Sequence, residues 1–233
     1  MVGMRSGADP ATARPSLVEG AYGALKAAIR NNVFPPGYQG SEQEIAQQLG
    51  MSRTPVHEAI IRLQEEGLVR VLARRGVVVC AISPEDMREI YEVIVALETA
   101  AAELIAERPE EARGSILAEL DAVNARMEAA LAEDDLVGWA EADGCFHQLL
   151  VERSGNTRLV RMFGTIMDQS HRARMLTLRL RPKPTLSIEE HRALVAAIRA
   201  GDVAAARDRA RAHRLRASRQ LLPLLGQFGK RHL

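Results

Sequence analysis

The 233 residues are enough for one large or two modest domains, and their apolar content of 47% is typical of a chain with a packed core. Two cysteines far apart in the chain, Cys80 and Cys145, exclude a disulfide framework, and no apolar run reaches the roughly 18 residues that span a bilayer. Aromatic residues make up 3% of the chain, which excludes a stacking platform for single-stranded nucleic acid.

The total charge is balanced, with 31 Lys and Arg against 30 Asp and Glu, but it is distributed unevenly. Residues 1–81 hold 9 basic and 7 acidic residues, residues 82–151 hold 4 and 17, and residues 152–233 hold 18 and 6. A basic C-terminal third alone would suggest nucleic-acid binding. We favour acidic and basic helices that neutralise one another within one bundle, because the basic residues fall on amphipathic helical patterns.

The N-terminal region is predicted to begin with a flexible tail over residues 1–15. This segment lacks the apolar stretch of a secretory signal, which indicates a cytoplasmic protein. An amphipathic helix is predicted over residues 17–31, and the rigid turn Phe34–Gly37 ends it.

Residues 41–66 predict two short helices joined by a tight turn. Ser41 and Glu44 have the spacing of a capping box, and Gly50 supplies the backbone freedom with which a helix ends. Ser52 begins the next helix, with Pro55 in its first turn. Helices joined so tightly cross steeply and leave the first turn of the second helix exposed. That turn carries Arg53, Thr54 and His57.

The exposed turn has the properties of a nucleic-acid contact. A helix N-terminus with free donors and a cation fits a phosphate backbone and the major groove beyond it. The alternative is an ordinary helical hairpin within a core. Residues 68–81 favour the first interpretation, because two strand-like segments flank the basic tip Ala73-Arg74-Arg75-Gly76 and predict the two-stranded wing of a winged helix.

The rest of the chain reads as helix throughout. We place the domain boundary at Ile82–Ser83 with almost no linker, and Ser83 caps the first of six predicted helices. Ser187 and Glu190 predict a second capping box. The six helices are expected over residues 84–107, 110–132, 135–154, 156–180, 187–200 and 202–225. The predicted fold is therefore mostly α: a winged helix-turn-helix over residues 16–82, then an all-α antiparallel bundle over residues 83–233.

Four residues of the bundle form a candidate metal site. Asp143 and His147 lie one turn apart on the same helix face, and His191 and His213 fall on the last two helices. One carboxylate and three imidazoles suit Zn²⁺, Ni²⁺, Mn²⁺ or Fe²⁺. The alternative is a set of unrelated side chains on solvated faces, and the sequence leaves open whether the three helices converge. Cys145 lies roughly 200° around the helix from Asp143, so it is rejected as a ligand.

The N-terminal segment resembles the DNA-binding domain of the GntR family of bacterial transcription regulators. The resemblance is carried by Ser52-Arg53-Thr54-Pro55-Val56, Glu58-Ala59 and the run from Leu63 to Val69. It implies that a homodimer binds a pseudo-palindromic double-stranded operator. The residues that it implies for DNA contact are Gln43, Ser52, Arg53, Thr54, His57, Arg75 and Gly76. His57 and Gln43 stand where members of the family usually have arginine, which implies an unusual base preference and weaker phosphate contacts.

The C-terminal segment is similar to the FCD effector domain of the FadR-like subfamily. The resemblance is carried by Asp143-Gly-Cys-Phe-His147, Ser154-Gly-Asn156, Glu190-His191, Gly201-Asp202 and His213. It implies that Asp143 and the three histidines chelate a divalent metal, with zinc favoured, and that a small carboxylate effector completes the coordination. Arg172 and Arg174 are the candidate effector contacts. Ile94 lies near a position where the family often has arginine, which implies a less charged or partly apolar effector.

Together these features predict a ligand-responsive transcription regulator, acting as a dimeric repressor that an organic acid releases from DNA. One alternative is a metal-dependent enzyme built on the bundle, for which Glu190 is the sole candidate acid or base. Another is a direct sensor in which the ion itself is the signal. No membrane contact is expected. The effector, the operator and the regulated genes cannot be identified from the sequence.

Overall fold

The computed structural model describes residues 16–229, so the tail predicted for residues 1–15 lies outside it. The contacts between residues divide the chain into two compact units. The described part of the first unit comprises residues 16–29 and 37–80, and that of the second comprises residues 30–36 and 81–229. Among the described residues, no helix is both long enough and apolar enough to cross a membrane.

The first unit is a small α+β domain. Its helices are α1 (Leu17–Arg30), α2 (Glu42–Gln48) and α3 (Arg53–Glu65), and its strands are β1 (Gln39–Gly40), β2 (Val69–Leu72) and β3 (Gly76–Val79). The sheet is antiparallel in the order β1-β3-β2, with Gln39 opposite Val78 and Val69 opposite Val79. A third strand, β1, thus joins the two that the sequence predicts. It was not predicted because two residues are too few to show an alternating pattern.

The turn between α2 and α3 forms as the sequence predicts. The Ser41 hydroxyl accepts a hydrogen bond from the Glu44 amide, and the Glu44 carboxylate accepts one from the Ser41 amide, which confirms the capping box. Gly50 adopts φ 65°, a left-handed conformation that ends α2 and lets the Met51 amide donate to the Ala46 carbonyl. The buried faces of both helices cover the core, with Pro55 and Val56 of α3 among them, and leave Arg53 and Thr54 at the start of α3 in solvent.

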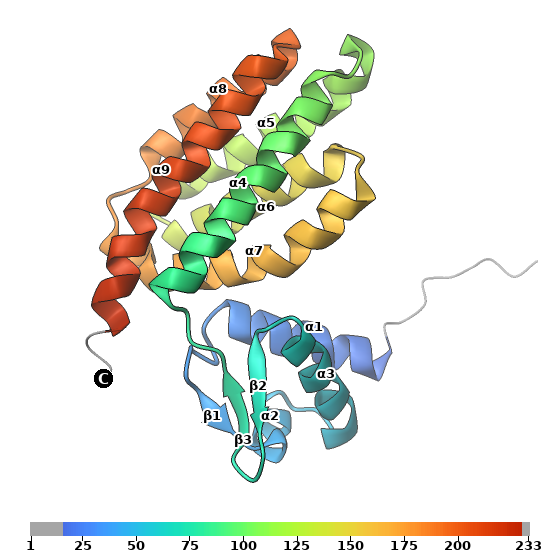
Figure 1. Cartoon of the computed structure of the whole chain (residues 1–233), viewed down its shortest axis with the longest axis vertical. Coiled ribbons are helices and arrows are strands. Elements are labelled where there is room, and N and C mark those ends of the chain that lie inside the picture. The colour runs from blue at the N-terminus through green and yellow to red at the C-terminus, as the bar shows by residue number, and fades with distance from the viewer. Residues whose placement is uncertain (1–15, 230–233) are drawn as a thin grey trace, which may run out of the picture. The chain divides into compact units, whose positions relative to one another are not determined.

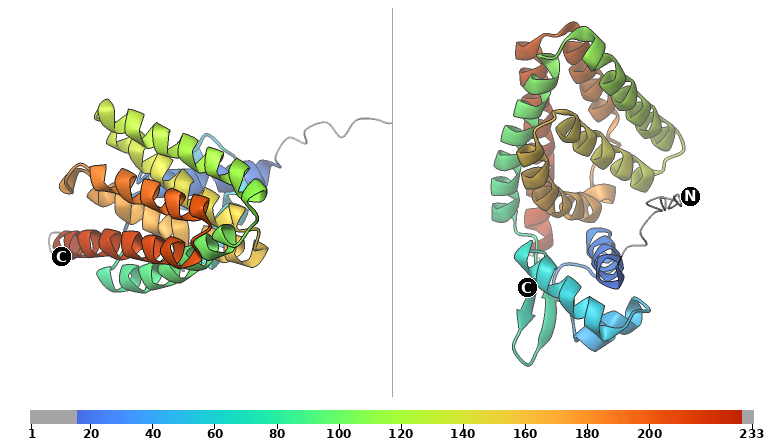
Figure 2. Two further views of the ribbon diagram at one scale, coloured as in Figure 1. Left: turned by 90° about the horizontal axis from the view of Figure 1, so that it is seen from above. Right: turned by 90° about the vertical axis from the view of Figure 1, so that its right-hand side faces the viewer.

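The second unit is the predicted antiparallel bundle. Its helices are α4 (Pro84–Ala106), α5 (Glu110–Ala132), α6 (Leu136–Arg153), α7 (Thr157–Thr177), the 3₁₀ turn η1 (Leu178–Leu180), α8 (Thr185–Ala200) and α9 (Val203–Gly229). Helices α4 and α9 run side by side (Figure 1), and α8 lies between α5 and α9 (Figure 2). All described elements after β3 are helical, which confirms the prediction of a mostly α protein.

The start of α8 differs from its prediction. The helix begins at Thr185, directly after Pro184, and no side chain caps it. Ser187 is therefore inside the helix, and its hydroxyl accepts a hydrogen bond of 3.1 Å from Nη2 of Arg216. The predicted capping box of Ser187 and Glu190 is wrong because both side chains are held by α9 and not by the local backbone.

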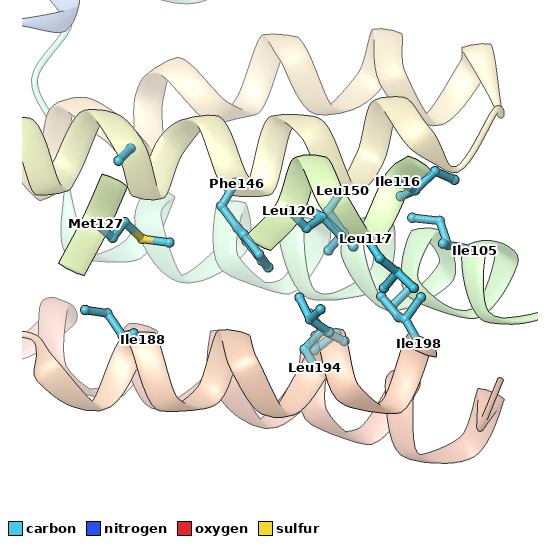
Figure 3. Packing of buried hydrophobic residues seen from close by; sticks show 14 of the residues in the cluster. Ile105, Ile116, Leu117, Leu120, Met127, Phe146, Leu150, Ile188, Leu194 and Ile198 are labelled. Carbon is cyan, nitrogen blue, oxygen red and sulfur yellow. The ribbon is translucent and has the colours of Figure 1, made fainter. Parts of the chain in front are cut away.

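The main core of the bundle lies where α5, α6 and α8 meet. Leu117 and Leu120 of α5 and Phe146 of α6 are buried and face Leu194 of α8 (Figure 3). Burial of one such side chain contributes roughly 1.5–3 kcal/mol. This apolar layer fixes the helices whose polar side chains form the site described next.

Candidate functional site

The exposed turn at the start of α3 presents the polar side chains that the sequence singles out. The described side chains of Gln43, Ser52, Arg53, Thr54 and His57 are all exposed, and that of Arg53 is 67% exposed. Ser52 stands at the N-cap position but makes no capping hydrogen bond. The free amides at this end of α3 and the Arg53 guanidinium therefore face solvent together, where they can receive an anion.

The wing lies beside this turn. Gln43, Arg53, Arg74 and Gly76 line one surface groove between the helices and the β2–β3 hairpin. Gly76 adopts φ 83°, and a Cβ there would lie 2.5 Å from the Gly40 carbonyl oxygen, so only glycine fits. Arg75 is exposed at the hairpin tip but does not line the groove, whereas its neighbour Arg74 does. The sequence placed Arg74 in the basic tip of the wing but did not include it among the predicted DNA contacts.

A carboxylate of α2 holds two of these side chains. Oε1 of Glu42 lies 2.8 Å from Nδ1 of His57, and its Oε2 lies 3.4 Å from Nε of Arg53. The hydrogen bond with His57 lowers the pKa of Glu42. Glu42 therefore orients both groups at the helix tip, a function that sequence reasoning missed because it depends on the contact between two helices.

The four candidate ligands in the bundle converge. Asp143 and His147 come from α6, His191 from α8 and His213 from α9; all are buried, and their potential ligand atoms lie within 4.8 Å of one another. Nε2 of His213 is 3.2 Å from Nε2 of His191 and 3.3 Å from Nε2 of His147. Nitrogens that share a tetrahedral Zn²⁺ at about 2.1 Å lie about 3.4 Å apart, so the spacing suits one cation.

Two further carboxylates face the outer nitrogens of the imidazoles. Oε2 of Glu190 lies 2.7 Å from Nδ1 of His213. Oε2 of Glu98 lies 3.0 Å from Nδ1 of His147, although this contact is poorly aligned for a hydrogen bond. Carboxylates in this position hold the imidazole proton on Nδ1 and leave the Nε2 lone pair for a metal. His191 instead stacks on Phe146, with ring centroids 4.1 Å apart.

Burial favours the neutral forms of His191 and His213. Burial lowers the pKa of His213 to about 4, although the Glu190 carboxylate opposes this shift. Burial and the neighbouring imidazoles also hold the pKa of His191 well below its usual range. Burial opposes ionisation of Asp143, but Arg174 and His147 outweigh it and hold the pKa of that carboxyl well below its usual range. Neutral histidines and an ionised aspartate are the forms that bind metal. The residues present therefore fit a divalent transition metal.

A cavity opens onto this cluster. Its volume, measured as the space open to the centre of a water-sized sphere, is about 30 Å³, and Asp143 and His213 are among its lining residues. Four arginines also line it: Arg174, Arg181, Arg214 and Arg216. Arg172, the other predicted effector contact, is buried in α7 and is not among the lining residues.

The charge of this cavity was not foreseen from the sequence. Ile94 is buried in an apolar cluster with Phe163 and does not line the cavity, so its presence does not make the cavity apolar. Arg181, Arg214 and Arg216 were missed because nothing in the helical pattern distinguishes them from solvated charges. Glu98 was also missed, because its partner Arg214 lies on a helix that is far away in the sequence.

Comparison with known proteins identifies both units. The family described as "Bacterial regulatory proteins, gntR family" matches residues 17–79, and the FCD domain matches residues 89–216, which is more than half of the chain. The chain belongs to the GntR family. As a GntR protein with an FCD domain it is a DNA-binding transcription regulator and not an enzyme.

Individual relatives agree with this assignment. An HTH-type transcriptional regulator from the TAR-I ttuE-ttuC' intergenic region of Agrobacterium vitis is 56% identical over 134 residues, 58% of this chain and 78% of the relative. A regulator from an unstable DNA locus of Streptomyces ambofaciens is 31% identical over 82% of this chain and 79% of its own. The HTH-type transcriptional repressor RspR of Escherichia coli is 31% identical over 56% of each chain.

Solved structures share the fold of this GntR protein. E. coli McbR/YncC matches with a TM-score of 0.79 over 92% of this chain and 99% of its own, at 23% identity. A putative GntR regulator from Rhodococcus sp. RHA1 matches with a TM-score of 0.76 over 89% and 98%, at 24% identity. At these identities the likeness shows the fold alone.

Removal of the Glu42 carboxylate from this GntR protein should weaken discrimination between operator and random DNA. Glu42→Gln frees Arg53 and His57 from the group that orients them, so we expect the ratio of operator to random affinity to fall about fivefold, the contribution of one side-chain hydrogen bond. Loss of a negative charge beside the phosphates should at the same time raise affinity for random duplex. Titrations of both DNAs by fluorescence anisotropy measure the two affinities.

Glu58→Gln provides the control for this experiment, because it removes an exposed carboxylate from α3, the helix that carries Arg53 and His57. We expect this control to raise random affinity without lowering the ratio. An equal fall of the ratio in both variants would show that net charge, and not orientation by Glu42, sets the discrimination.

The buried pair of Glu98 and Arg214 should be necessary for folding stability. Nε of Arg214 donates to Oε2 of Glu98 at 2.7 Å, and both side chains are almost fully buried. Arg214→Met leaves the carboxylate without its cation and should destabilise the chain by about 3–5 kcal/mol, whereas the double variant Glu98→Gln/Arg214→Met should recover much of this loss. Chemical denaturation in the presence of a chelator measures the difference without a contribution from bound metal.

The same pair predicts the pH dependence of stability. Burial raises the pKa of Glu98, but Arg214 and His147 outweigh it and lower that pKa from 4.5 to about 2. The stabilisation is therefore present above pH 4.5 and is lost as the pH falls toward 2. The free energy of unfolding of the double variant should depend less on pH in this window. The same pH dependence as in the wild type would show that the pair is not its source.

Proposed function

We propose that this GntR regulator is a homodimeric repressor whose affinity for a pseudo-palindromic operator falls when a small carboxylate effector binds at a divalent metal in the FCD domain. The proposal places the protein in the cytoplasm, with the DNA. The observation that carries it is the convergence of Asp143 and three Nε2 atoms in a buried cluster beside a cavity.

The donor set supports the metal. Three imidazoles and one carboxylate suit zinc above all, with nickel, manganese and iron as alternatives. Hydrogen bonding of Glu190 to Nδ1 directs the lone pair of His213 inward. A cation between the three Nε2 atoms would bind all three lone pairs, whereas in its absence Nε2 of His213 can only exchange N–H···N hydrogen bonds of 3.2–3.3 Å with the neighbouring imidazoles.

The lining of the cavity supports a carboxylate effector. Arg174 reaches the cavity and contacts Asp143, so it can bind an acid that approaches the metal. A bound effector changes operator affinity only if it binds one arrangement of the dimer better than another. The relative RspR is described as a repressor, which supports release of DNA over recruitment of polymerase as the mode of regulation.

The winged helix supports a major-groove contact by α3. Arg53 can bind guanine or phosphate, and Gln43 and His57 can reach base edges. Ser52 and Thr54 offer hydroxyls and amides to phosphate, and the wing, with Arg75 and Gly76 at its tip, can contact the neighbouring backbone. Two copies related by a two-fold axis would bind two half-sites.

One experiment tests the proposal as a whole. Elemental analysis of the purified protein should find about one transition-metal ion per chain. Gel-shift titrations on DNA from the flanking promoter should then show release by small organic acids with the metal-loaded protein only. Equal release of DNA from the metal-free protein would show that the effector does not bind at a metal. Release by the metal alone, with no acid present, would instead identify a direct metal sensor.

A further inference from the structure

The cavity beside the metal cluster contains more positive charge than a single carboxylate can neutralise. Four arginines line it, and three carboxylates pair with them, which leaves one surplus positive charge. A divalent cation bound by Asp143 and the neutral histidines raises the surplus to three. A monocarboxylate would leave two of these charges without a partner in a half-buried site, which is costly.

The four arginines differ in how they are paired. Arg214 is bound to Glu98, and Arg216 to Glu190 through two hydrogen bonds of 2.5 Å. Arg174 contacts Asp143 through Nη1 alone. Arg181 has no carboxylate within ion-pair distance among the side chains that the structure describes.

Three buried donor atoms at the cavity have no hydrogen-bond partner within residues 16–229. They are Nη2 of Arg174, Nε of Arg181 and Nε1 of Trp139. Arg174 and Trp139 are each only 3% exposed, so solvent cannot easily satisfy these atoms. All three groups can only donate hydrogen bonds. The ligand that completes the site must therefore present several acceptor oxygens beyond those that reach the metal cluster.

Arg181 lies beside Arg174, because its Nη2 donates to the Arg174 carbonyl at 3.3 Å. It follows η1, in the connection that leads to α8, and so approaches the cavity from a different element than the four metal ligands. The charge and the free donors are thus divided between the metal cluster and a second, arginine-based subsite.

On the basis of the effector site proposed above, we propose that the effector is a small dicarboxylate: one carboxylate reaches the metal cluster, and the second is bound by Arg181, with Arg174 and Trp139 as further donors. Arg181 is then the residue that distinguishes di-acids from mono-acids. A guanidinium binds a carboxylate through two parallel hydrogen bonds, which gives this contact both strength and direction.

Matched pairs of acids test this assignment on the zinc-loaded full-length protein. Malate and 2-hydroxybutyrate differ in one distal carboxylate, as do succinate and butyrate. Isothermal titration should show each di-acid binding at least about tenfold more tightly than its partner, the expected effect of one charge-assisted hydrogen-bonded pair. Arg181→Gln should abolish this ratio by weakening di-acid binding alone, with unchanged zinc content.

Arg179→Gln is the control, because Arg179 is an exposed arginine of the same segment that does not line the cavity. It should keep the wild-type ratio. Equal binding of di-acids and mono-acids would overturn the proposal, as would an equal loss of both in Arg181→Gln. Binding of inorganic phosphate as tight as that of the di-acids would also overturn it, because one compact dianion would then suffice.

These outcomes are distinct from failure of the effector function itself. If mono-acids and di-acids bind equally but only with zinc present, the metal-dependent effector site stands and the two-carboxylate assignment fails. If no acid binds the zinc-loaded protein better than the metal-free protein, both fail.

Discussion

Replacing Arg53 with alanine should lower operator affinity about 100-fold, the upper end of the effect of one bidentate arginine contact. The side chain is exposed at the N-terminus of α3, beside free backbone donors, and lines the groove between helix and wing. Among the described side chains Arg53 pairs with Glu42, so the substitution should remove the proposed contact to DNA and little that stabilises the fold. Gel-shift or anisotropy titration measures the affinity.

Arg126→Ala is the control for Arg53→Ala, because it removes an exposed arginine from α5 in the other unit. It should leave operator affinity within about twofold, since only charges near the phosphates affect counterion release. Circular dichroism and metal content should be unchanged in both variants. Unchanged operator affinity in Arg53→Ala would contradict the assignment of α3 as the DNA-contacting helix.

Replacing His213 with alanine should remove the bound metal and the response to the effector together. Loss of a residue that merely supports a ligand lowers metal affinity by about 10–100-fold, and loss of a ligand should cost more. His191→Ala should behave in the same way. Elemental analysis and acid-induced release from the operator are the two measurements, and the metal-free variants should also unfold at a lower temperature in the presence of zinc.

His171→Ala is the matched control, because His171 is also a buried imidazole of the bundle but is not part of the cluster. Burial and the charge of Arg174 lower its pKa to about 3, so it is neutral, and neither ring nitrogen has a hydrogen-bond partner in the described structure. This variant should keep both the metal and the response. If His213→Ala keeps both at the wild-type level, the cluster is not the metal site.

The parts of the structure that follow local rules could be predicted from the sequence. The capping box of Ser41 and Glu44 and the turn at Gly50 depend on residues a few positions apart, and both are confirmed. The i,i+4 spacing of Asp143 and His147 predicted that they share one helix face; the structure shows that both are buried, while Cys145 between them is exposed.

The remaining features depend on contacts between distant segments. Helical spacing could not show that α8 and α9 bring His191 and His213 to α6. The local pattern at Ser187 even predicted the wrong role, because Arg216 of α9 binds this hydroxyl and the neighbouring Glu190. Arg181 looked like an ordinary surface charge, and only the cavity shows that it lacks a carboxylate partner.

His213, Arg214 and Arg216 lie within one turn of α9, and each reaches a different part of the site. His213 joins the cluster, Arg214 binds the carboxylate beside His147, and Arg216 binds the carboxylate beside His213. A descendant that exchanged Arg216 to accept another metabolite would also disturb Glu190 and hence the proton on His213. In the proposed effector site, metabolite specificity and metal affinity are therefore coupled through Glu190, which restricts the substitutions by which a descendant could change its effector.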